Sequence, residues 1–227
     1  MSGGGRGARA GSTSTQSSCA LAGNGAALVR ERAVAGRVQA ALERLYRLDR
    51  VADVGDFVHD AGAGGREELL LREADDGALE LSLRLPQLEG GLQGGAGLDG
   101  FCQIIEGVSH FVYLVERVRV GRAATQLELE LQAEVDKWVV LAASMRAFDA
   151  RESAALRSRL YESVAFTHAA RSEPGERYRL ANEAAHAFVR RLEREYVGTA
   201  RYGAMRAELL HFFQVGQEGK LRLGRAA

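Results

Sequence analysis

The stretch Phe101–Val118, FCQIIEGVSHFVYLVERV, is the most apolar segment of the chain and decides the expected fold. Apolar residues recur in it at the three- and four-residue spacing of a helix, and Glu106 and His110 interrupt them four residues apart. Asp99 precedes the stretch as a capping residue, which predicts a helix over 100–120. We therefore expect a function, if the chain has a binding or catalytic site, on this apolar helix with its titratable side chains.

The connection to the next helix, GRAAT, is short, and a short turn predicts that two helices fold back antiparallel. The second helix is predicted over 126–147. Thr125 and Glu128 form a capping box there, in which each side chain satisfies a free amide of the first turn. The sequence therefore predicts a helical hairpin centred near Ala123.

Ionisable side chains of the two helices are expected to meet along this hairpin. Counting outward from its centre at equal rise per residue places His110 level with Asp136 and within one turn of Glu134. The same count places Arg117 beside Glu128. Glu134 interrupts an apolar stripe, and a buried carboxylate needs a partner because removing its charge from water costs several kcal/mol. The prediction is a polar layer made of Glu106, His110, Tyr113, Arg117, Glu128 and Glu134.

This layer has more than one interpretation. In the structural interpretation, the layer is a fully hydrogen-bonded network that fixes the register of the two helices. Acid–base catalysis by a His110–Glu134 pair needs an open cavity. The Glu-x-x-His spacing of di-metal helical bundles is absent, because Glu106 and His110 lie one residue further apart. No cofactor and no metal are therefore predicted, and the catalytic candidates are Glu106, His110 and Glu134.

The rest of the chain predicts a mainly helical α+β protein. Residues 26–48 have a helical apolar pattern, and residues 67–86, EELLLREADDGALELSLRLP, are two alternating strands around an Asp-Gly turn. A hairpin of two strands is marginal alone, so it is expected to pack on helices. Further helices are expected over 150–170, 174–196 and 202–214.

Composition predicts the domain organisation. Residues 1–25 are expected to be a disordered Gly/Ser-rich tail, and a transit peptide over 1–30 is the alternative. Residues 26–227 are expected to form one α-rich domain. Its parts, in chain order, are a helix with a β-hairpin over 26–86, a Gly-rich linker over 87–98 and a helical bundle over 99–214. The fold class is α+β, predominantly α, with five to six helices and one small antiparallel β-hairpin packed on them.

The overall charge balance argues against some partners. The chain has 30 basic and 30 acidic residues and a formal net charge of zero, so it lacks the basic excess typical of nucleic-acid binding. No apolar run reaches the roughly 18 residues that cross a bilayer, and no secretory signal is seen, so a cytoplasmic location is expected. Cys19 and Cys102 form no metal or disulfide motif. Lys137 and Lys220 are the only lysines.

No nucleophile motif, phosphate-binding loop or zinc-protease motif occurs in the chain. The leading hypothesis is therefore a non-catalytic interaction or regulatory protein in a larger assembly, with a protein partner or a homo-oligomer. The alternative is an enzyme, or a sensor for a metal or small ligand, with its site at Glu106, His110 and Glu134. A sealed layer favours the first hypothesis, and a layer that opens to a pocket favours the second.

Overall fold

The computed structural model describes residues 17–73, 79–88 and 95–225. Short 3₁₀ and π segments cover Val54–Asp56, Ser158–Glu162 and Glu193–Val197. The fold is α+β and mainly α, as predicted. In chain order the main elements are α1 (Ser17–Tyr46), β1 (Val58–Asp60), β2 (Glu68–Glu73), β3 (Leu79–Leu85), α2 (Gly95–Arg119), α3 (Gln126–Ser144), α4 (Ala150–Arg157), α5 (Glu173–Leu192), α6 (Tyr202–Gln214) and α7 (Gln217–Arg225).

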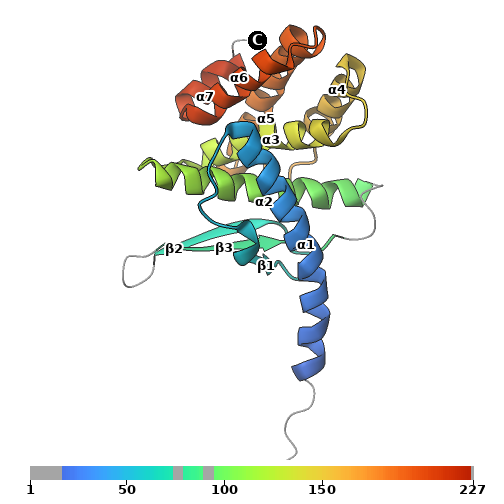
Figure 1. The fold of residues 1–227 in the computed structure, drawn as a ribbon, viewed down its shortest axis with the longest axis vertical. Helices are drawn as coiled ribbons and strands as arrows, with labels where there is room; N and C mark the ends of the chain where they lie inside the picture. Colours follow the sequence, from blue (N-terminus) through green and yellow to red (C-terminus); the bar gives the residue numbers. More distant parts are fainter. Residues whose placement is uncertain (1–16, 74–78, 89–94, 226–227) are drawn as a thin grey trace, which may run out of the picture.

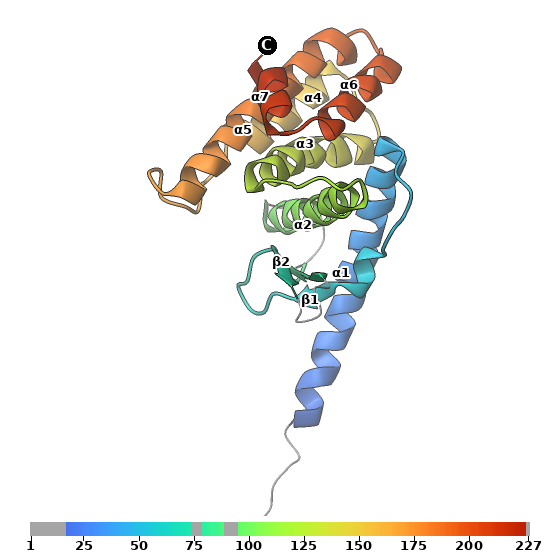
Figure 2. The ribbon, with the colours of Figure 1, turned by 90° about the vertical axis from the view of Figure 1, so that its left-hand side faces the viewer.

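The elements are stacked in layers, which Figures 1 and 2 show from two sides. The small sheet lies against α2, α3 packs on the other side of α2, and α5, α6 and α7 lie beyond α3. Helix α1 runs along one side of the stack, and its N-terminal part projects beyond it. The core between the layers holds fully buried aromatic side chains, among them Trp138, Phe188 and Phe212.

The α2–α3 hairpin follows from local signals. Gly121, with a φ of 67°, turns the chain after α2 in a conformation that glycine adopts without strain. The capping box at the start of α3 is confirmed: Glu128 N–H donates to Thr125 Oγ1 at 3.1 Å, and Thr125 N–H donates to Glu128 Oε2 at 2.9 Å. We refer below to the line of contact between these two helices as the α2–α3 seam.

The sheet differs from the predicted hairpin, because it has three strands in the order β1-β3-β2. Strands β2 and β3 pair antiparallel, with Leu69 opposite Leu83, whereas β1 pairs parallel with β3. Only three residues form β1, too few for an alternating pattern to show in the sequence. The predicted Asp-Gly turn lies outside the described residues. Gly107 of α2 lets the sheet approach closely, since a Cβ there would lie 2.8 Å from Leu83 Cδ1.

Two predicted boundaries in the N-terminal half are wrong. Helix α1 begins at Ser17, within the segment expected to be a disordered tail, and residues 1–16 lie outside the described residues. Helix α2 begins at Gly95, within the expected Gly-rich linker, of which residues 89–94 are not described. Asp99 is consequently inside the helix and accepts a hydrogen bond from Gln103 at 2.7 Å instead of capping the helix.

Two further differences concern the C-terminal half. The helix expected to reach residue 170 ends as a π segment at Glu162, because residues 163–171 are almost all exposed and have little packing to hold them helical. Helix α7 lies beyond residue 214, where the predicted helical bundle ends. It is ordered because Lys220 is fully buried and Gly224 packs against Ala184, and both contacts are too distant in sequence to be predicted.

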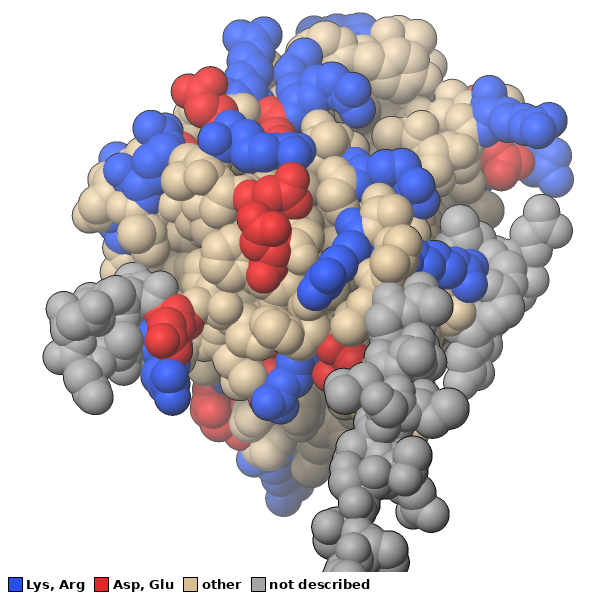
Figure 3. Space-filling model, turned by 60° about the horizontal axis from the view of Figure 1, so that its bottom comes forward, with Lys and Arg blue, Asp and Glu red and all other residues tan. Residues whose placement is uncertain are grey.

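No helix in residues 17–73, 79–88 and 95–225 is long and apolar enough to cross a membrane. On the face that Figure 3 shows, acidic and basic side chains lie among one another, in keeping with the net charge of zero.

Candidate functional site

The predicted polar layer is divided between two flanks of the α2–α3 seam. Glu106 and His110 lie on the flank that faces β2 and α5, whereas Tyr113 and Arg117 lie on the flank that faces α7. These α2 residues extend over roughly 16 Å of helix at about 1.5 Å per residue. The elements that pack on α2 change over that length, so one line of side chains meets two environments.

The α7 flank holds a closed ion pair. Arg117 Nη2 donates to Glu128 Oε1 at 3.0 Å, and both side chains are buried. The turn before α7 covers this pair, because a Cβ at Gly216 would lie 3.0 Å from Glu128 Oε1. Tyr113 is close to the same turn, where its hydroxyl donates to Val215 O at 3.4 Å. These contacts are those of a packed interior.

A second buried network lies on this flank and is centred on Asp136. Its carboxylate accepts hydrogen bonds from Ser109 Oγ at 2.6 Å, from Gln132 Nε2 at 3.0 Å and from the Tyr46 hydroxyl. Burial raises the pKa of Asp136 to about 6. Asp136 lies near the level of His110 as predicted but bonds to Ser109, since consecutive helix residues point about 100° apart.

Lys220 closes this network from α7. Its ammonium donates to Gln132 Oε1 and to Phe212 O, both at 2.6 Å, and lies 4.2 Å from the centre of the Phe212 ring. Burial lowers the pKa of Lys220 well below its usual value. A pocket of about 630 Å³ lies at the turn before α7, but the fully buried Asp136 and Lys220 do not line it, so this network is closed off from it.

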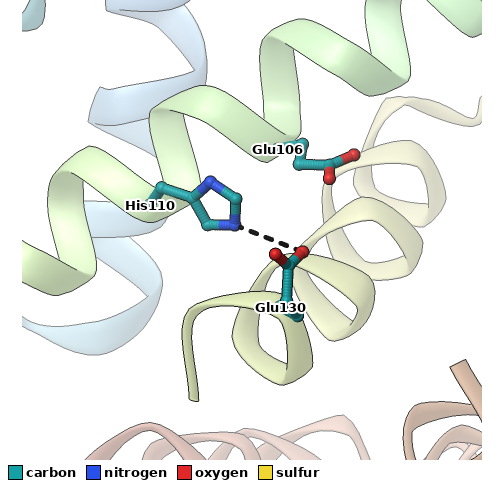
Figure 4. A group of neighbouring side chains, drawn as sticks. All are labelled: Glu106, His110 and Glu130. Atoms are coloured by element: carbon teal, nitrogen blue, oxygen red, sulfur yellow. Dashed lines mark ion pairs between the residues drawn. The ribbon is translucent and has the colours of Figure 1, made fainter. Parts of the chain in front are cut away.

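The opposite flank contains a cluster of carboxylates around His110, shown in part in Figure 4. The His110 ring lies between two of them: Nδ1 is 3.9 Å from Glu67 Oε1 and Nε2 is 3.9 Å from Glu130 Oε2. His110 is only 6% exposed, yet its Nε2 atom has no hydrogen-bond partner within the described residues. Burial lowers the pKa of His110 to about 4, so the ring is neutral at physiological pH.

The expected His110–Glu134 pair is wrong, because Glu130, one turn earlier on α3, faces the imidazole instead. Glu134 accepts a hydrogen bond from Lys137 Nζ at 2.7 Å, and the same ammonium lies 3.3 Å from Glu106 Oε2. Burial alone lowers the pKa of Lys137, but the charges of Glu106 and Glu134 outweigh it and raise that pKa well above its usual value. Lys137 thus joins the two predicted carboxylates.

Carboxyl groups outnumber cationic groups in this cluster. Burial raises the pKa of Glu67 well above its usual range, and the neighbouring Glu106 and Glu130 raise it further. Burial and the charge of Glu106 raise the pKa of Glu130 to about 8, although Arg177 Nε lies 3.8 Å from its Oε1 atom. The groups that share this space are four carboxylates and two cations: Glu67, Glu106, Glu130, Glu134, Lys137 and Arg177.

Part of the cluster lines a pocket of about 600 Å³, and His110 and Glu130 are not among its lining residues. Glu67, Glu106, Glu134 and Lys137 line its inner part, and exposed residues such as Arg66 belong to its outer part. The remaining walls come from β3, from the segment after the π turn and from α5, with the residues Arg84, Val164, Phe166, His168 and Tyr178. The two flanks of the α2–α3 seam therefore differ: the Asp136 network is closed off from its nearby pocket, whereas carboxylates near His110 line theirs.

The donor set suits a metal ion. One ligand atom from each of Glu106, His110 and Glu130 lies within 4.8 Å of the others. Cys102 is not a further candidate, since burial raises the pKa of its thiol to about 11 and keeps it protonated. Sequence reasoning missed Glu67, Glu130 and Lys137.

A signal for Glu130 was present in the sequence. Glu130 and Glu134 repeat, on the second helix of the hairpin, the four-residue spacing that Glu106 and His110 have on the first.

No protein-family model matches the chain, and no curated protein or solved structure matches it either.

Proposed function

We propose that this protein binds a divalent transition-metal ion through Glu106, His110 and Glu130, of which Glu106 also lines the pocket. The observation that carries the proposal is the His110 Nε2 atom. It is buried, has no hydrogen-bond partner in the described parts of the chain, and points at the carboxylate of Glu130 (Figure 4). An unpartnered polar atom in an interior costs about 1–3 kcal/mol, and a bound cation removes that cost.

The chemistry of these side chains fits such an ion. A neutral imidazole nitrogen and carboxylate oxygens are the donors that zinc, manganese and ferrous iron accept in proteins. Ligand atoms lie about 2.0–2.2 Å from such ions, so atoms that are already within 4.8 Å of one another need only small side-chain rotations. Glu67 lies on the other side of the ring, as a carboxylate that orients a metal-binding histidine does.

The crowding of carboxyl groups supports the same proposal. The cluster has more carboxyl groups than cations, and Glu130, with a pKa of about 8, keeps a proton at pH 7 that a divalent ion can replace. Three protein ligands leave coordination positions for water or for a molecule from the pocket, as in catalytic and sensing metal sites. The metal- or ligand-binding alternative from the sequence is therefore the function that the His110 flank favours.

Other expectations stay predictions. These are a non-catalytic interaction or regulatory role in a larger assembly, a protein partner or homo-oligomer, and a cytoplasmic location. A metal-binding site is compatible with a regulatory role, since a bound ion can change the conformation that a partner recognises.

Titration of metal-free protein with Co²⁺ tests the proposal, with visible absorption and calorimetry as readouts. We expect one ion per chain and at least a 100-fold loss of affinity in Glu106→Gln and His110→Ala. His211→Ala, which changes an exposed histidine on α6, is the matched control and should bind as the unmodified protein does. Circular dichroism establishes that the variants are folded. Equal affinity in Glu106→Gln and in the unmodified chain, or no binding by either, would refute the proposal.

A further inference from the structure

The pocket beside the metal-binding residues is large enough for a small organic molecule. Its volume of about 600 Å³ lies within the range of roughly 300–1,000 Å³ typical of small-molecule sites. Glu106 belongs both to the pocket wall and to the metal-binding set, so a molecule in the pocket can reach a bound ion. Phe166 and Tyr178 give the wall an aromatic part on which carbon atoms can pack.

The outer part of the pocket carries a guanidinium that no carboxylate occupies. Arg66 is exposed there and forms no ion pair with any described residue. It is close enough for its charge to lower the pKa of Glu67 and of Glu106. Arg84 lines the same part but is paired with Glu68 at 3.1 Å. A planar guanidinium without a partner fits a carboxylate with two parallel hydrogen bonds.

The inner part of the pocket offers another donor. The ammonium of Lys137 has three N–H groups, and its contacts within the described chain are with Glu106 and Glu134. One N–H group is therefore left for an oxygen atom of a ligand. Lys137 is largely buried, with 12% of its side chain exposed, so this donor is held in place by its two partners.

The bound metal offers the pocket an open coordination position. A carboxylate oxygen can take that position, whereas a protonated amine has no free electron pair and cannot. Arg66 keeps the outer part of the pocket positive whether or not the metal is bound. We therefore propose, on the basis of the proposed metal site, that the pocket binds a small organic carboxylate. One end of this molecule takes an open position of the metal next to Lys137, and the rest extends toward Arg66.

Binding is then ordered, with the metal first. An organic cation shows the opposite dependence, because it would occupy the carboxylates of the metal-free pocket and compete with the metal. Dicarboxylates and diamines of equal chain length distinguish the two ligand classes without a change in size.

The experiment titrates succinate, glutarate, 1,4-diaminobutane and 1,5-diaminopentane into the full chain, with and without Co²⁺, by calorimetry and visible absorption. We expect a dicarboxylate to bind only to the cobalt-loaded protein and to shift the cobalt spectrum. Arg66→Ala should weaken that binding by about 10- to 100-fold, the usual effect of losing a charge-assisted hydrogen bond. The control Arg72→Ala changes an exposed arginine of β2 that pairs with Glu80 outside the pocket, and should have no effect.

The outcomes separate this inference from the function on which it rests. Failure of the chain to bind Co²⁺ refutes the metal site and the inference together. If Co²⁺ binds and neither dicarboxylate does, the inference fails and the metal site stands. Binding of a diamine in competition with Co²⁺, or an equal effect of Arg66→Ala and Arg72→Ala, also overturns the carboxylate assignment.

Discussion

Replacement of Glu130 by glutamine should stabilise the metal-free protein at alkaline pH. Glu130 has 9% of its side chain exposed, and its pKa rises from 4.5 to about 8 in the folded chain because burial and the charge of Glu106 oppose ionisation. The native state therefore holds a proton that the unfolded chain gives up above pH 4.5. Stability conferred by that proton falls as the pH rises from 4.5 to 8. Glutamine resembles the protonated carboxyl and avoids this loss.

The size of the effect follows from the two pKa values. Each pKa unit of difference is worth about 1.4 kcal/mol, so the full loss is about 5 kcal/mol. Between pH 6.5 and 8.5 the unmodified protein should lose about 2 kcal/mol of this amount. His110 and Asp136, with pKa values of about 4 and about 6, titrate mostly below pH 6.5. They therefore contribute little to the loss of stability between pH 6.5 and 8.5. The raised pKa of Glu67 acts in the same direction.

Urea unfolding in the presence of EDTA measures this effect at pH 6.5, 7.5 and 8.5, with fluorescence of the single, fully buried Trp138 as the probe. Glu130→Gln should be more stable than the unmodified chain by about 4 kcal/mol at pH 8.5. Glu128→Gln is the matched control on the same helix. It should lose about 3–5 kcal/mol at every pH, because Arg117 would be left buried without its partner. The reasoning is refuted if Glu130→Gln is less stable than the unmodified chain at pH 8.5.

Three further predictions concern the packing and the metal. Gly107→Ala should destabilise the protein by about 1–3 kcal/mol and weaken Co²⁺ binding, since the new Cβ would lie 2.8 Å from Leu83 Cδ1 and 2.9 Å from Glu67 Oε2. Gly36→Ala, with open space around its Cβ, should instead gain about 0.5–1 kcal/mol, and similar values for the two variants would contradict this. Co²⁺ binding at pH 7 should release about one proton from Glu130, as calorimetry in buffers of different ionisation enthalpy can show; no buffer dependence would contradict it. Co²⁺ at 100 times its Kd should raise the free energy of unfolding by about 2.7 kcal/mol, and a similar rise in the metal-ligand variants would count against the site.

Local signals in the sequence were enough to predict much of the helical part. The apolar spacing, Gly121 and the capping box of Thr125 indicate α2, α3 and the turn between them, and the structure has these elements. The ends of α1, α2 and α4 differ from the prediction, because helix ends depend on tertiary packing more than on propensity. Helix α7 depends on the burial of Lys220, which donates a hydrogen bond to Gln132, 88 residues earlier in the sequence.

The candidate site could be predicted only in part, because it depends on which neighbours meet each flank of α2. Glu106 and His110 were identified as unusual from their place in an apolar helix. Glu67 reaches His110 only because the sheet packs on α2, and no local pattern indicates that contact. The sequence predicts Glu134 as the partner of His110, but the structure has Glu130. Which of the two faces His110 depends on the orientation of the two helices, and sequence spacing does not determine that orientation.

A purely structural role explains the α7 flank better than it explains the His110 flank. Asp136, Gln132 and Lys220 already join α3 to α2 and α7 through buried hydrogen bonds, and such a network can fix the register of helices. The carboxylates around His110 add no comparable bonds to the imidazole and lower the stability of the metal-free chain at alkaline pH. Apolar side chains of similar size would hold the same helices together without the free-energy penalty of burying charged groups. Groups with strongly raised pKa values that line an open pocket are instead typical of binding and catalytic sites, where stability is given up for affinity. The contrast between the two flanks of one helix pair is thus the strongest physical reason to assign function to Glu106, His110 and Glu130.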